Sequence, residues 1–67
     1  MEKIAYAACE EILRKEGTDI VEFQGKNYEI SFHMQSKEDV RNFISSGQEI
    51  AKIKIVGSTI TIMGFEE

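Results

Sequence analysis

The clearest pattern of hydrophobic and polar positions lies between residues 50 and 65. Two runs there alternate isoleucine with lysine or threonine on either side of Gly57-Ser58. A period of two is typical of strands that bury one face, and a two-residue turn containing glycine favours a tight hairpin. The pattern therefore predicts a hairpin whose isoleucines share one face. The predicted pairs are Val56 with Thr59, Ile55 with Ile60, and Ile53 with Ile62.

A second alternating pair of runs occupies residues 20–23 and 28–34, around turn-forming residues at 24–27. This arrangement predicts an earlier hairpin whose large apolar side chains lie on one face. The expected register pairs Phe23 with Tyr28 and Val21 with Ile30.

Two segments show the three-to-four residue spacing of amphipathic helices. The first covers residues 2–16 and is expected to end at Gly17, because glycine readily adopts the left-handed conformation that stops a helix. The second is expected to begin after Ser36 as N-cap and to end at Gly47. Its apolar stripe consists of Val40, Phe43 and Ile44.

These elements predict one α+β domain over residues 1–67, with the order α-β-β-α-β-β and a four-stranded antiparallel sheet. Both helices are expected on one face of the sheet. The preferred strand order is 2-1-3-4, because a short right-handed crossover carries the second helix across strand 1. That order also sets Glu22 near Lys52 or Lys54, whereas the alternative order 1-2-4-3 brings His33 close to Met63.

The expected core combines the apolar faces of both helices and both hairpins. Its members are Ala8, Cys9, Ile12, Leu13, Val21, Phe23, Tyr28, Ile30, Phe32, Val40, Phe43, Ile44, Ile53, Ile55, Ile60 and Ile62.

Composition and charge restrict the range of possible functions. A chain of 67 residues leaves little room for a deep substrate cavity, and a net charge of −4 disfavours binding to phosphate backbones. The single cysteine indicates a reducing compartment. We also see no apolar run long enough for a signal peptide or a membrane span, so we expect a cytoplasmic protein without membrane contact.

The chain lacks a constellation of residues that would support catalysis, a cofactor or a metal. Cys9 lies on the apolar face of the first helix, where burial suppresses the thiolate, and His33 is expected on the opposite side of the sheet. His33 and Glu29 share that side but are separated by about 13 Å of strand, which is too far for one ion to bridge. We therefore expect neither an enzyme nor a cofactor-binding or metal-binding protein.

The sheet face without helices offers the only functional indication. Apolar residues at positions 20, 50, 56, 63 and 65 fall on it in the predicted register, and such patches are common in interfaces. We therefore expect a non-catalytic protein-interaction module or small regulatory protein. The expected interaction residues are Ile50, Lys52, Lys54, Met63 and Phe65.

Two alternatives stay open, namely a nucleic-acid binder that uses the strand carrying Lys52 and Lys54, and a small-molecule binder in a dimer groove. Self-association is a further expectation. In the order 2-1-3-4 the last strand, Thr59 to Gly64, is an edge without charge, so a homodimer through this edge is a specific hypothesis.

Overall fold

The computed structural model describes residues 2–15, 19–33 and 35–66 of the chain. Its two helices and four strands follow one another in the predicted order, which confirms the α+β class. The elements are α1 (Glu2–Arg14), β1 (Ile20–Phe23), β2 (Lys26–Phe32), α2 (Lys37–Ser45), β3 (Ile50–Val56) and β4 (Thr59–Phe65).

The strands form one sheet in the order β1-β2-β4-β3. Both hairpins are antiparallel, but β2 and β4 pair in parallel. The preferred order 2-1-3-4 and the purely antiparallel sheet were therefore wrong, and the alternative order 1-2-4-3 is observed. As that alternative requires, the end of β2 lies beside β4, where the His33 N–H donates to the Ile62 carbonyl at 3.0 Å.

The distribution of charge along the strands explains this order. β4 has no charged residue, and its side chains Ile60 and Ile62 are fully buried, so it suits a central position. β3 carries Lys52 and Lys54, which are best tolerated at an edge. The uncharged β4 is therefore not the edge strand that the sequence predicted. Its lack of charge instead marks the strand that is paired on both sides.

The registers of the two hairpins were predicted with different success. In the second hairpin the pairs Val56–Thr59, Ile55–Ile60 and Ile53–Ile62 are confirmed. In the first hairpin Val21 pairs with Tyr28 and Phe23 with Lys26, so the predicted register was wrong by two residues. The turn is shorter than the expected residues 24–27. Gln24 and Gly25 both adopt positive φ (54° and 76°), so these two residues form the whole turn.

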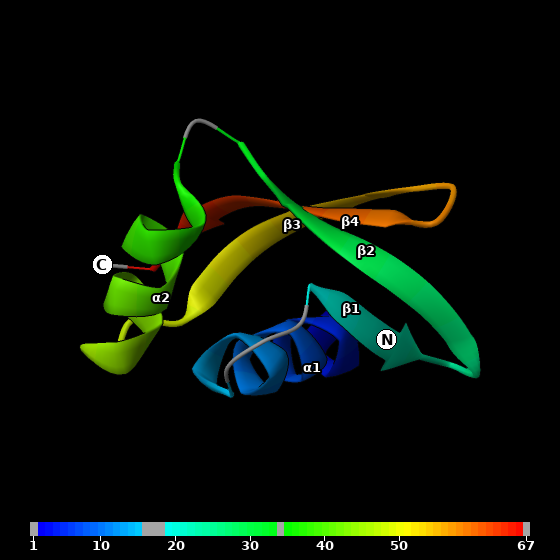
Figure 1. Cartoon of the computed structure of the whole chain (residues 1–67), viewed down its shortest axis with the longest axis horizontal. Coiled ribbons are helices and arrows are strands. Elements are labelled where there is room, and N and C mark those ends of the chain that lie inside the picture. The colour runs from blue at the N-terminus through cyan, green and yellow to red at the C-terminus, as the bar shows by residue number, and fades with distance from the viewer. Residues whose placement is uncertain (1, 16–18, 34, 67) are drawn as a thin grey trace.

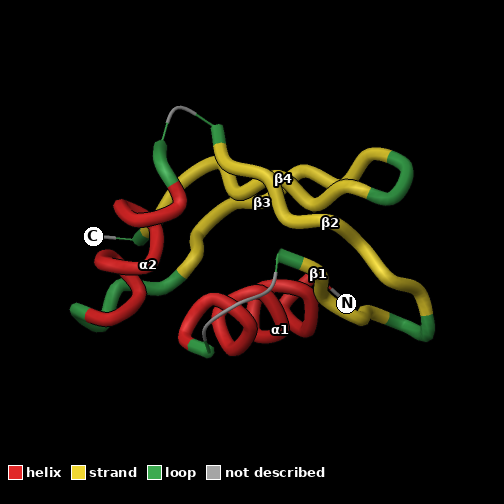
Figure 2. The backbone as a smooth tube through the Cα atoms, in the orientation of Figure 1, coloured by secondary structure: helices red, strands yellow, loops and turns green. Residues whose placement is uncertain are grey.

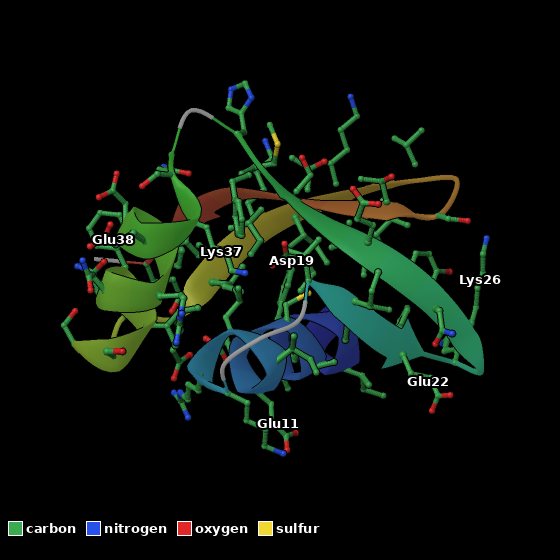
Figure 3. The ribbon with its side chains drawn as sticks, viewed as in Figure 1. Glu11, Asp19, Glu22, Lys26, Lys37 and Glu38 are labelled. Carbon is green, nitrogen blue, oxygen red and sulfur yellow. The ribbon has the colours of Figure 1, made fainter. Side chains whose placement is uncertain are left out.

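A shift of two residues preserves the side on which each side chain lies, so the apolar face of the first hairpin survives the error. The shift also brings Lys26 onto this face. Its ammonium lies 5.1 Å from the centre of the Tyr28 ring and donates to the Gly57 carbonyl at 3.3 Å, which ties the two hairpin ends together (Figure 3).

The caps of α2 are confirmed. The Ser36 hydroxyl accepts a hydrogen bond from the Asp39 N–H at 3.1 Å, and Gly47 follows the helix with φ of 96°. The predicted stop of α1 at Gly17 lies outside the described residues, as does Met34 at the end of the first hairpin.

The helices cover one side of the twisted sheet, as Figures 1 and 2 show. α1 lies beneath the sheet and contacts both edge strands, β1 and β3, while α2 packs against α1 at one end. The Lys37 ammonium forms an ion pair with the Asp19 carboxylate at 2.9 Å, which joins the start of α2 to the start of β1.

The core lies between α1, α2 and the inner face of the sheet. Most predicted core side chains are buried or packed against the buried cluster, but Ile55 (39% exposed) and Phe43 (37% exposed) are not buried as expected. Ile55 lies near the hairpin turn, beyond the reach of α1, and Phe43 lies at the rim of α2 against Phe65. The buried hydrophobic residues are Ala5, Cys9, Leu13, Val21, Phe23, Ile30, Val40, Ile44, Ile50, Ile60 and Ile62.

Candidate interaction surface

The side of the sheet opposite the helices forms a continuous surface, called here the uncovered face. Its centre is the parallel pair of β2 and β4, in which Ser31 lies beside Thr61 and Glu29 beside Thr59. β3 extends this face with Lys54 next to Thr61 and Val56 next to Thr59. The serine and both threonines are only partly exposed, whereas Glu29, Lys54 and Val56 are exposed. The face therefore has a weakly polar centre between charged margins.

Two of the five predicted interaction residues lie elsewhere. Ile50 is 4% exposed and belongs to the core, and its N–H donates to the Glu10 carboxylate of α1 at 3.0 Å. Phe65 pairs with Ile50 and is only partly exposed, because its ring packs on Phe43 of α2 with centroids 5.2 Å apart. The placement of Ile50 and Phe65 on the uncovered face was therefore wrong.

Irregular pairing at the start of β3 explains this difference. The register shifts on both sides of Lys52, so simple alternation does not carry from Ile53 back to Ile50. Such bulges bend a strand and turn its side chains. The sequence contains one signal of them, Gly64 within β4, because glycine inside a strand often accompanies a bulge.

The other three predicted residues are accessible. Lys52 and Lys54 are exposed and Met63 is partly exposed. Neither lysine forms an ion pair with another residue of the described ranges. The prediction that Glu22 lies near Lys52 or Lys54 was wrong, since β1 and β3 are opposite edges of the sheet. The two lysines thus form a basic margin along β3, while Glu22 (labelled in Figure 3) and Glu29 lie on the β1–β2 side.

The two residues with potential for nucleophilic chemistry lie in different environments. Cys9 is fully buried among core side chains, and this burial, together with the neighbouring Glu10 charge, raises the pKa of the thiol to about 11. His33 is exposed at the end of β2. The arrangement leaves Cys9 as a small hydrophobic side chain of the core.

The surface of the described residues carries open grooves. One groove of about 440 Å³ runs between α1 and the start of β3, lined by Tyr6, Glu10, Ala51 and neighbours. Within residues 2–15, 19–33 and 35–66 no three His, Cys, Asp or Glu side chains are grouped closely enough to hold a metal ion.

The fold and the uncovered face together define a small two-layer α+β domain with a sheet surface available for contact. No protein-family model, curated protein or solved structure matches this chain. Neither described helix has the length and apolar character needed to cross a bilayer.

Proposed function

We propose that the protein is a non-catalytic interaction module, or a small regulatory protein, that binds a protein partner through its uncovered face. The observation that carries the proposal is that both helices pack on the other side, so that the parallel β2–β4 pair and the basic margin of β3 stay accessible. The contact residues in this proposal are Lys52, Lys54 and Met63, with Thr59 and Thr61 at the centre.

The chemistry of this face supports a protein partner. Partly exposed Met63, Thr59 and Thr61 offer a weakly polar surface whose desolvation costs little free energy, and lysines at the margin add steering and selectivity. Cytoplasmic location is part of the proposal and is supported by the free, buried thiol of Cys9. The exposed lysines also favour nucleic acid as a second candidate, which the net charge of −4 opposes.

The experiment is affinity capture with a residue at the centre of the uncovered face replaced. Thr61→Arg places a long cation in the middle of the face, whereas Asn42→Arg places the same charge on the exposed side of α2. We expect Thr61→Arg to lose the captured protein at least roughly tenfold, since a charge buried without a partner is costly. Asn42→Arg is expected to retain it.

Both variants change the net charge equally, so long-range electrostatics cannot separate them. Equal retention by the two variants would contradict the uncovered face as the binding surface. A captured species that nuclease removes would instead establish the nucleic-acid alternative.

A further inference from the structure

The two edges of the sheet differ in how well they are protected from pairing with another strand. β1 is four residues long, and very short edge strands are poor templates. β3 is seven residues long and has a neighbour on one side only. With β4 in the interior, the predicted homodimer through β4 was wrong, and β3 is the edge to consider.

The start of β3, before Lys52, is closed to further pairing. The Ile50 N–H already donates to the Glu10 carboxylate, and the register shifts around Lys52 bend the strand. The second half pairs regularly with β4 and extends away from α2 toward the hairpin turn (Figure 1). Ile55 is 39% exposed and Val56 is 61% exposed there, although both are apolar residues in a regular strand.

The hairpin geometry defines which backbone groups of β3 are free. Val56 and Thr59 flank a two-residue turn and pair with each other, so the backbone groups of Val56 and Lys54 face β4. The alternate residues Ile53 and Ile55 therefore present their N–H and C=O groups at the open edge. A second strand could accept and donate hydrogen bonds at both positions.

We infer that two copies of this chain associate through the second half of β3, antiparallel, with the two-fold axis at Lys54. This inference goes beyond the proposed function and does not depend on it. In this register Ile53 lies opposite the partner's Ile55, and the reverse pair repeats it across the axis. Each exposed Val56 lies opposite the partner's Lys52, whose alkyl stem covers it.

Neighbouring registers fit less well. An axis at Ile55 places Ile53 against the partner's Gly57, which is in the turn with φ of 59° and whose carbonyl accepts from Lys26. An axis at Ile53 brings Lys54 against the partner's Lys52 twice and uses the bent start of β3. The axis at Lys54 keeps both isoleucine pairs and brings only one pair of like charges together.

Repulsion within that single pair of like charges means that Lys54 weakens the proposed dimer. Cross-strand like charges are destabilising, and the short edge buries less than the roughly 1,200 Å² of a standard interface, so the wild-type dimer is weak. Removing the charge therefore strengthens the dimer. This result is the reverse of what a lysine at a favourable interface would give.

Sedimentation equilibrium from about 10 µM to about 1 mM covers the range expected for so small an interface. The wild-type mass is expected to rise above 7.6 kDa only at the upper end. Lys54→Thr should lower the dissociation constant roughly fivefold or more, since threonine suits strands and carries no charge. A mixture of wild type and Lys54→Glu should favour the heterodimer over both homodimers.

Cysteine cross-linking tests the register. Lys54→Cys places two thiols directly opposite each other at the axis, within the Cα separation that a disulfide needs, and should cross-link under mild oxidation. Val56→Cys is the control, because its two thiols would be about 13 Å apart along the strands. Cross-linking of both variants at the same rate would overturn the inference, as would a Lys54→Thr variant that stays monomeric at about 1 mM.

Discussion

At the scale of single residues, exposure within a strand depends on what lies above each side chain rather than on alternation alone. Ile55 and Ile60 pair directly and point to the same side, yet Ile55 is 39% exposed and Ile60 is fully buried. Ile60 lies on the central strand between two neighbours, whereas Ile55 lies on the edge strand beyond α1. Two isoleucines that pair with each other thus contribute differently to the stability of the fold.

Cys9 yields a prediction about pH. Its thiol has a pKa of about 11 when folded, against an ordinary value of 9.0, because burial disfavours the charged form. The folded protein holds this proton more tightly, so the associated stability is complete below pH 9.0 and is lost as the pH rises toward about 11. Urea unfolding between these limits should show wild type losing on the order of 2 kcal/mol more than Cys9→Ala. Parallel pH profiles for the two proteins would contradict this account.

At the scale of elements, the junction of α1 with β3 determines where the sheet can bend. Ile50 is held between the core and the Glu10 carboxylate, so the irregular start of β3 is attached to the helix rather than left open. A hydrogen bond to a charged acceptor contributes more than a neutral one. This hydrogen bond has no local signal in the sequence, because Glu10 and Ile50 are separated by forty residues of chain.

Replacing Glu10 tests this junction. Glu10→Ala is expected to lower the free energy of unfolding by about 1–3 kcal/mol, because the partly buried Ile50 N–H loses its acceptor. Glu11→Ala is the matched control, since Glu11 is exposed and forms only an (i, i+4) ion pair with Lys15, a contact that contributes a few tenths of a kcal/mol. Denaturant unfolding compares them directly. Equal losses would show that the bond to Ile50 has no special role.

The elements also show what the sequence could and could not reveal. Local patterns located the Ser36 cap, the Gly47 stop and the register of the second hairpin, because each depends on residues that are close in sequence. The parallel pairing of β2 with β4 could not be read in this way, since both candidate orders bury the same faces. The relevant signal was the absence of charged residues from β4. It indicates a strand paired on both sides, whereas the sequence-based prediction placed this strand at an edge. The placement of Ile50 and Phe65 on the uncovered face was wrong for a different reason, namely the irregular pairing around Lys52.

At the scale of the whole molecule, β4 connects the two hairpins. It pairs with β2 on one side and β3 on the other, and its Ile60 and Ile62 are fully buried. The sheet is thus held together through its last strand, and β1 and α2 lie at its periphery. Local opening is expected to begin at the periphery, where fewer contacts must break.

Hydrogen exchange provides the corresponding measurement. The amides of Ile60 and Ile62 are expected to exchange most slowly, close to the rate set by global unfolding, and those of β1 to exchange at least roughly tenfold faster. Dilute protein should be used, so that association does not protect β3. Exchange of β4 as fast as that of β1 would contradict a central role for β4.

The central position of β4 also constrains how the protein folds during synthesis. When a ribosome has released the chain only as far as β3, the first hairpin and β3 have no shared neighbour, because β4 separates them in the sheet. The edges of β2 and β3 that pair with β4 stay unpaired until this strand emerges from the exit tunnel. Nascent chains of this protein are therefore expected to engage chaperones until β4 emerges, and then to fold in one cooperative step.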